Sequence, residues 1–254
     1  SLLGPATSNV FQLRGTVAAN PPAGADPYSV PVYDPGLWTG SVLRDVLEEE
    51  GISATGEVRR VTAEEKIPAG TLVATHDTPI LTTLKRANTN SINMMAECMC
   101  KRLGHDATGE PGSWENGTAA VEAYVKSLGA EGSWVHLDDG SGLSSKNRVA
   151  AKAFTTVLAH IAARPDGELF VNTLATPGSN GTLRTRFRSM SVAGAIHAKT
   201  GHISGVSTLS GYIDTNTGER RRIVFSILVN KHQGNVNPWQ DEVCQAIYGW
   251  ANGK

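Results

Sequence analysis

The stretch GAIHAKTGHISGVSTLSGYIDT, residues 194–215, decides the fold. It contains two runs of strand-forming residues that are separated by a Ser-Gly pair, and a third run, RRIVFSILVN, follows at 221–230. The DTNTGE segment between the second and third runs is rich in hairpin-turn residues. These features predict an antiparallel three-stranded meander over 195–230, with a helix at 237–252 packed against it. Positions 224–229 are mostly apolar on both faces, which predicts a central strand covered on both sides.

Helical periodicity dominates the sequence that precedes these strands. We expect helices at 37–52, 78–86, 92–104, 116–130 and 147–165. Gly51 suits the C-cap of the first helix, while Thr78 suits the N-cap of the second and Pro79 its first residue. A helical middle, an antiparallel meander and a covering helix together predict an α+β layered domain.

The composition changes near Leu37. Residues 1–36 are rich in proline and small side chains, and two strand-like runs, at 10–17 and 28–34, flank a proline-rich loop. The remainder of the chain lacks that character. We therefore predict that residues 1–36 form a region separate from the domain at 37–254.

Bulk properties exclude several function classes. The chain has 254 residues, 40% of them hydrophobic, so it can bury a sizeable core. Its formal net charge is −1. This charge does not favour nucleic acid or an anionic membrane as a partner. The three cysteines, Cys98, Cys100 and Cys244, are too few for a disulfide framework and are expected to be packed free thiols.

Two short motifs suggest chemistry. Lys199-Thr200-Gly201 lies in the first predicted strand, and Ser91-Ile92-Asn93 lies at a break between two predicted helices. Alone, each has a simpler interpretation: a surface lysine beside a turn, and a helix N-cap serine. Ser145-Lys146-Asn147 repeats the second pattern by chance.

Together, the motifs occur in the order S-x-N then K-T-G, as in penicillin-binding proteins and class A β-lactamases. Longer segments carry the same resemblance: HDTPILTTLKRANTNSINMMAE (76–97), LDDGSGLSSKNRV (137–149), LATPGSNGTLRTRF (174–187), AIHAKTGHISGVSTLSGY (195–212) and RRIVFSILVN (221–230). Over about residues 37–250 the chain resembles the D-alanyl-D-alanine carboxypeptidase/endopeptidase branch of the class C low-molecular-mass penicillin-binding proteins. The resemblance implies a β-lactamase/transpeptidase-like domain, an antiparallel sheet flanked by helices, incomplete at its N-terminus.

The motif that supplies the nucleophile in this family is missing from these residues. The family's acylated serine and its lysine base belong to S-x-x-K, and no lysine of this chain has a serine three positions earlier. We therefore expect the C-terminal part of a longer protein. Residues 1–36 then resemble the end of an inserted accessory region, and 37–254 the C-terminal part of the transpeptidase-like domain. The alternative is a homologue that has lost its nucleophile.

The resemblance implies catalytic roles for Ser91, Asn93 and Lys199 in acyl transfer through a serine ester. Ser91 relays a proton to the leaving amine, Asn93 binds the amide on the acyl side, and Lys199 keeps the local potential positive. We expect the three side chains to converge in one cleft. No metal or organic cofactor is implied.

Substrate binding is assigned by the same resemblance to Thr200, Gly201 and His202. Thr200 holds the substrate carboxylate, and Gly201 leaves the strand edge open to an extended peptide. His202 stands where the family usually has threonine or serine, and its backbone N–H is assigned to the oxyanion hole. As a side chain, His202 is expected to be an ordinary residue of the strand surface.

Other polar groups have structural interpretations. Asp138 and Asp139 are adjacent, so they face opposite ways and do not form a glycosidase pair; the Asp139–Gly142 segment is expected to be a turn that borders the cleft. His76-Asp77 is expected to cap the helix at Thr78. The histidines show no metal-binding spacing, and GSNGTL lacks the ending of a P-loop.

The expected partners are peptidoglycan stem peptides ending in D-Ala-D-Ala, β-lactam antibiotics and the missing N-terminal part of the same protein. Such a substrate implies a periplasmic or cell-surface location. The chain alone is expected to show no peptidase activity and no penicillin adduct. Two alternatives stay open: a non-catalytic cell-wall binding module, and a β-lactamase or esterase of the same fold.

Overall fold

The computed structural model describes residues 2–3, 9, 12–13, 32–62, 64–179, 181–216 and 222–253. The chain divides into two units, residues 1–75 and 76–254. The predicted strand-like runs at 10–17 and 28–34 fall largely outside the described residues. The assignment of residues 1–36 to an accessory region stays a prediction.

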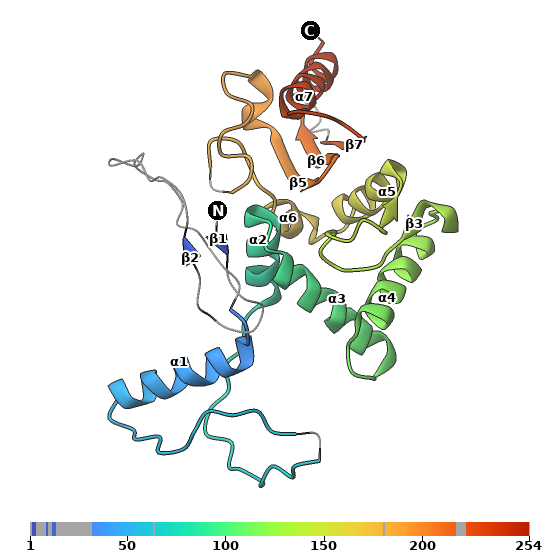
Figure 1. Ribbon diagram of the computed structural model, residues 1–254. Helices are drawn as coiled ribbons and strands as arrows, with labels where there is room; N and C mark the ends of the chain where they lie inside the picture. Colours follow the sequence, from blue (N-terminus) through green and yellow to red (C-terminus); the bar gives the residue numbers. More distant parts are fainter. Residues whose placement is uncertain are drawn as a thin grey trace, which may run out of the picture. The chain divides into compact units, whose positions relative to one another are not determined.

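Among its described residues, the first unit contains a short strand pair and one helix. Strand β1 (Leu2–Leu3) pairs antiparallel with β2 (Gln12–Leu13), and α1 spans Pro35–Glu49 (Figure 1). Helix α1 therefore begins two residues before the predicted start at Leu37. The reason is that the Asp34 side chain accepts a hydrogen bond from the backbone N–H of Leu37 (2.9 Å), and Pro35 suits the first turn. Beyond the helix, Gly51 has a φ of +79°, the left-handed conformation that glycine tolerates best.

The second unit is built on a three-stranded antiparallel sheet. Its strands are β5 (Ile196–Ile203), β6 (Val206–Asp214) and β7 (Arg222–Asn230), in the order β5-β6-β7 (Figure 1). The predicted meander is therefore confirmed. The prediction that 224–229 form a central strand is wrong, because β7 is an edge strand among the strands that the structure describes. The pattern of apolar residues along a strand indicates which of its faces are covered, but not whether a neighbouring strand pairs with each of its edges.

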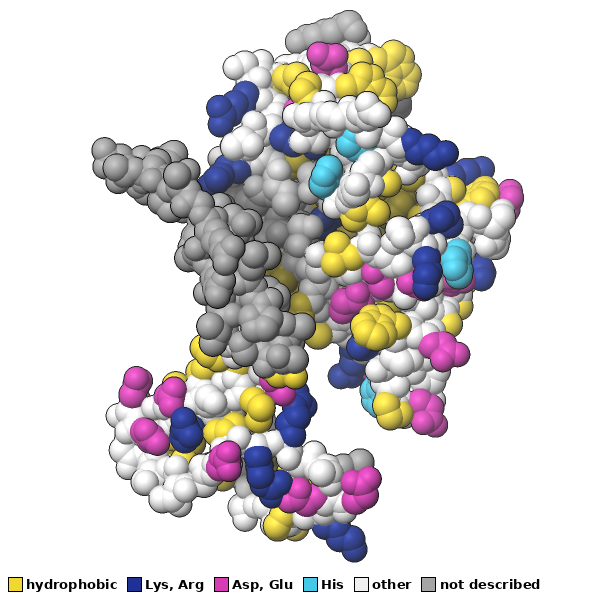
Figure 2. All heavy atoms as spheres, viewed as in Figure 1, with side chains coloured by type: hydrophobic (Ala, Val, Ile, Leu, Met, Phe, Trp, Pro, Cys, Tyr) yellow, Lys and Arg dark blue, Asp and Glu magenta, His cyan; other side chains and the backbone are white. Residues whose placement is uncertain are grey.

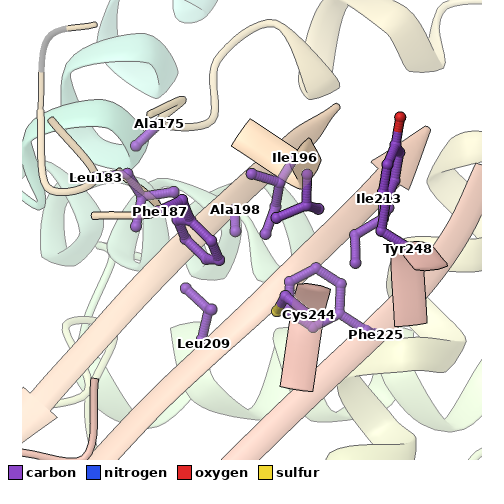
Figure 3. Packing of buried hydrophobic residues seen from close by; sticks show 11 residues of the cluster. Ala175, Leu183, Phe187, Ile196, Ala198, Leu209, Ile213, Phe225, Cys244 and Tyr248 are labelled. Atoms are coloured by element: carbon purple, nitrogen blue, oxygen red, sulfur yellow. The ribbon is translucent and has the colours of Figure 1, made fainter. Parts of the chain in front are cut away.

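Helix α7 (Asn237–Ala251) covers one face of this sheet, as predicted. Its Cys244 and Tyr248 belong to the largest hydrophobic cluster, together with residues of all three strands (Figure 3). Ile196, Leu209 and Ile213 are at most 1% exposed there. Burial of such a side chain contributes about 1.5–3 kcal/mol, so this cluster fixes the position of β5.

The opposite face of the sheet is covered by α5 (Ala151–Ala162) and α6 (Gly167–Val171). Tyr212 is fully buried between the strands and these helices, and its hydroxyl donates a hydrogen bond to the backbone carbonyl of Leu158 (2.8 Å). Val224 of β7 packs against the same cluster. The third strand is thus covered on both faces, as its composition predicted.

The remaining helices differ from the predictions at their ends. They are α2 (Ile80–Asn90), α3 (Asn93–Thr108) and α4 (Trp114–Ser127). Thr78 and the His76-Asp77 pair do not cap α2, because the N-cap position is Pro79 and no side chain caps it. Helix α4 begins earlier than expected, because Ser113 and Asn116 form a capping box.

The helix predicted from 147 begins at Ala151 instead. Residues Arg148–Val149 form strand β4, which pairs antiparallel with β3 (Val135–His136). This pairing joins segments that are distant in sequence, so local periodicity does not show it.

Surface features complete the description of the second unit. Cys100 and Cys244 are buried free thiols, but Cys98 is exposed, so the prediction that all three are packed is wrong for Cys98. Hydrophobic side chains such as Ile80 and Met94 remain on the surface, where Figure 2 shows hydrophobic groups lying among polar and charged ones. None of the helices in the described ranges has the length and apolar character needed to span a membrane.

Candidate functional site

Ser91 lies at the break between α2 and α3 in a left-handed backbone conformation, with φ 58° and ψ 50°. It is the C-cap of α2, and Ile92 is the N-cap of α3, so the N-cap interpretation of Ser91 is wrong. A non-glycine residue in this conformation costs about 1–2 kcal/mol. Such a residue persists only where its surroundings fix it.

The surroundings of Ser91 are fixed by the segment that follows α6. The Thr89 hydroxyl donates to the backbone carbonyl of Thr173 (2.8 Å), and the backbone N–H of Thr182 donates to the carbonyl of Thr89 (3.1 Å). The same segment reaches the sheet, because the Ala198 N–H donates to the Ala175 carbonyl (3.0 Å). These bonds tie the end of α2 to β5.

Gly181 permits this close approach. Its φ is +92°, and a Cβ placed on it would lie 2.2 Å from the carbonyl oxygen of Thr89. The sequence analysis did not predict that this segment packs against the end of α2. The Gly-rich GSNGTL run was the one sequence feature that could have indicated such a close approach.

Lys199 meets Ser91 directly. Its Nζ donates to Ser91 Oγ at 2.8 Å and also to the backbone carbonyl of Thr200. The predicted meeting of Ser91 and Lys199 is therefore confirmed. Burial lowers the pKa of Lys199 to about 8. No ion pair to Lys199 occurs among the residues that the structure describes. The hydrogen-bond acceptors of its ammonium group there, the Ser91 hydroxyl and the Thr200 carbonyl, are neutral.

The other predicted site residues lie close to this pair in sequence. Asn93 is the first residue of α3 and its side chain is exposed; within the described ranges it makes no hydrogen bond to Ser91 or Lys199. The three-way convergence is thus shown only for Ser91 and Lys199, and Asn93 stays a prediction.

The substrate-binding candidates continue β5 beyond Lys199. Thr200 pairs in register with Leu209, and Gly201 with Thr208. A Cβ on Gly201 would lie 2.4 Å from Thr208 Oγ1, so this glycine also serves the packing of the sheet. His202 is exposed on the strand, as expected.

The segment after β3 is a turn, as its sequence predicted, and two carboxylates hold it. Asp139 accepts hydrogen bonds from the backbone N–H groups of Gly142 (2.8 Å) and Ser144 (2.7 Å). Glu97 of α3 accepts from the N–H groups of Gly140 (3.0 Å) and Ser141 (3.2 Å). These acids therefore stabilise a turn.

A cavity of about 650 Å³ lies in the second unit. Residues from α2, from the segment after α6 and from β5 line it, including Lys85, Arg86, Asn172 and His197. Within the described part of the chain, no three His, Cys, Asp or Glu side chains are grouped so as to hold a metal ion.

Comparison with known proteins gives relatives over most of the chain. It is 30% identical over 242 residues to a D-alanyl-D-alanine carboxypeptidase of Actinomadura sp. (strain R39), covering 91% of this chain and 43% of the relative. It is 29% identical over 227 residues to the D-alanyl-D-alanine carboxypeptidase DacB of Haemophilus influenzae, covering 88% and 46%. The chain thus spans less than half the length of these curated relatives.

A solved structure shows the same fold. Penicillin-binding protein 4 (dacB) from Haemophilus influenzae, complexed with a β-lactam, matches with a TM-score of 0.71 and 26% identity, covering 88% of this chain and 53% of that one. The β-lactamase/transpeptidase-like fold that the resemblance implied is confirmed. The family model for D-Ala-D-Ala carboxypeptidase 3 (S13) matches residues 4–252. Since this match includes almost every residue, the chain belongs to the D-Ala-D-Ala carboxypeptidase 3 (S13) family.

Proposed function

We propose that this chain supplies the S-x-N and K-T-G parts of the acyl-transfer site of a serine-type D-Ala-D-Ala carboxypeptidase or endopeptidase. Its substrate is the peptidoglycan stem peptide. The observation that carries the proposal is the 2.8 Å hydrogen bond from Lys199 to Ser91, which joins two motifs 108 positions apart in sequence. The family match and the carboxypeptidase relatives support it.

In this mechanism Ser91 acts on the leaving group. The serine of S-x-x-K attacks the peptide carbonyl and gives its proton to the lysine of the same motif. The serine ester forms as the peptide C–N bond breaks, and the Ser91 hydroxyl passes its proton to the departing nitrogen and regains one from that lysine. Lys199, whose Nζ contacts Ser91 Oγ, keeps the local potential positive and lowers the cost of this transfer. Because its pKa is about 8, Lys199 is mostly protonated at neutral pH and the charge is present.

The remaining motif residues bind the substrate in this proposal. Asn93 donates a hydrogen bond to the amide on the acyl side, and the Thr200 hydroxyl binds the terminal carboxylate. Gly201 keeps the edge of β5 accessible to an extended peptide. The backbone N–H of His202 contributes to the oxyanion hole, where a donor of this kind contributes about 10²–10³-fold in rate.

The nucleophile is proposed to come from an S-x-x-K segment outside these 254 residues, because no such motif occurs within them. The intact protein is then acylated by penicillins and acts in the periplasm or at the cell surface. The solved relative in complex with a β-lactam supports the expected antibiotic binding.

A fluorescent penicillin tests this function. After incubation and denaturing electrophoresis, we expect a label on the longer protein that carries S-x-x-K and none on the 254-residue chain. Loss of a nucleophile leaves only about 10³–10⁴-fold catalysis over water, which is undetectable for a peptide bond. A stable label on the short chain would contradict the proposed source of the nucleophile, and an unlabelled long protein would contradict acyl transfer.

A further inference from the structure

Two histidine rings meet at one end of the sheet in the second unit. His202 lies near the end of β5 and His232 follows β7, and their ring centroids are 6.2 Å apart, with the ring planes tilted by 49°. The backbone N–H of His232 donates to the carbonyl of Gly205, in the turn between β5 and β6 (3.3 Å). This bond holds the segment after β7 against that turn, so two residues distant in sequence are brought together.

The ring of His232 is oriented with one nitrogen available as a ligand. Its Nδ1 lies 3.0 Å from the carbonyl oxygen of Gly234, which can only accept a hydrogen bond, so Nδ1 carries the proton. In the neutral ring the lone pair is then on Nε2, which is buried and has no hydrogen-bond partner among the described residues. A buried acceptor of this kind is rare unless an ion or a water molecule binds it.

This arrangement is typical of histidines that bind a metal ion. Such a histidine usually donates its other ring N–H to a backbone carbonyl or a carboxylate, which fixes the tautomer and the orientation of the ring. The separation of the rings fits as well. Because a zinc–nitrogen bond is about 2.0–2.1 Å long and a ring nitrogen lies about 1.2 Å from its centroid, two rings on one ion have centroids about 5–6.5 Å apart. The 6.2 Å between His202 and His232 lies within this range.

His202 can supply the second ligand. Its side chain is exposed, and its ring forms no hydrogen bond with a described residue, so it can turn toward His232 without losing a partner. Imidazole suits zinc, copper and nickel, whereas Mg²⁺ and Ca²⁺ prefer oxygen ligands. We propose that His202 and His232 together form a binding site for a late first-row transition-metal ion such as Zn²⁺. Since no third His, Cys, Asp or Glu of the described ranges is grouped with the pair, water completes the coordination.

An ion at this site ties the end of β5 to the segment after β7. His202 directly follows Lys199-Thr200-Gly201, so the ion also fixes the backbone beside that motif. Because it binds the folded chain, the ion stabilises the fold. Neither ligand needs the nucleophile or the proposed acyl transfer, so the 254-residue chain is sufficient for the test.

Titration of Zn²⁺ into the ¹⁵N-labelled chain tests this site. We expect the ring ¹⁵N resonances of His202 and His232 to shift before those of the other histidines, and Mg²⁺ at the same concentration to shift neither. The melting temperature should rise with the zinc concentration. Zinc that shifts neither ring of the pair, or that shifts other histidine rings at the same or a lower concentration, would overturn the proposal.

Removal of each ligand gives the second arm. His202→Gln and His232→Gln should each weaken zinc binding at least about tenfold. The matched control is His105→Gln, which should leave the affinity unchanged. The His105 ring is held in the same way, with Nδ1 2.8 Å from the carbonyl oxygen of Glu110, but it has no ring contact with another described histidine.

The exposed position of His202 keeps this arm decisive. If His232→Gln fails to fold, unchanged zinc affinity in His202→Gln still refutes the proposal, because substitution of an exposed side chain leaves the fold intact. An equal loss in His105→Gln would mean that scattered histidines bind zinc adventitiously, and it would refute the proposal as well.

Discussion

At the scale of single residues, Ser91 combines two demands that conflict. The proposed function needs a hydroxyl at this position, and Lys199 donates a hydrogen bond to it, while the backbone conformation with φ 58° is one that glycine adopts more easily. The strain is offset by the hydrogen bonds that join Thr89 to the neighbouring segment. In the proposed function, the need for a hydroxyl thus outweighs the local backbone preference.

Replacing Ser91 measures that strain. Ser91→Gly and Ser91→Ala both remove the hydroxyl, so the difference between them reports the backbone conformation alone. We expect the glycine variant to be about 1 kcal/mol more stable than the alanine variant, by urea denaturation. At Thr155, inside α5, the same pair should show the opposite order, because alanine is favoured in a helix. The same order at both positions would contradict strain at Ser91.

Lys199 should lower the stability of the fold at neutral pH. Its folded-state pKa of about 8 lies below the ordinary value of 10.5, so the unfolded chain binds more protons between these two values. The free energy of unfolding therefore rises with pH through this window. We expect Lys199→Met to be about 1–3 kcal/mol more stable than the wild type at pH 7, with the difference nearly gone at pH 11, above the unfolded-state pKa. Denaturation at both pH values measures it, and a variant that is less stable at pH 7 would contradict this account.

At the scale of elements, glycine lets α3 and α4 approach closely. A Cβ on Gly117 would lie 2.5 Å from the backbone carbonyl oxygen of Cys100, which cannot move without displacing its helix. We expect Gly117→Ala to lower the free energy of unfolding by about 2–4 kcal/mol, despite the better helix propensity of alanine. Gly194→Ala, where nothing lies within 4 Å, should stay within about 0.5 kcal/mol of the wild type. Equal effects would rule out the steric explanation.

A buried ion pair joins α7 to the segment before β5. The Arg186 Nε donates to Asp241 Oδ1 at 2.9 Å, and the two side chains are only 9% and 11% exposed. Arg186→Met should cost about 3–5 kcal/mol, because it leaves a buried carboxylate without its partner. Arg102→Met, which removes an exposed pair with Asp106, should cost less than about 0.5 kcal/mol. Thermal melts of both variants compare the two, and a small loss for Arg186 would show that Asp241 finds another partner.

At the scale of the whole molecule, the hydrophobic clusters all lie in the second unit. Each of the three described clusters consists of residues beyond position 120. A chain that begins at His76 should therefore unfold cooperatively at a temperature within a few degrees of the full 254-residue chain. Calorimetry measures this, and loss of the cooperative transition would show that residues 1–75 stabilise the second unit.

Alternation and motif order predicted the features that depend on local pattern. The meander, the covering helix and the meeting of Ser91 with Lys199 are examples. The pairing of β3 with β4 and the edge position of β7 were not predictable, because they depend on contacts between distant segments. The cavity was missed for the same reason, since backbone bonds of Thr89 and Ala198 assemble it and no side-chain pattern encodes them.

The low pKa of Lys199 has a practical consequence for labelling. At pH 8 about half of its amine is uncharged, whereas an ordinary lysine has well under about 1% in that form. Only the uncharged amine attacks activated esters, so a limiting amount of such a reagent should modify Lys199 before the surface lysines. Any molecule that covers the Lys199 amine should slow this modification. The rate of labelling at this one side chain therefore reports binding without any need for turnover.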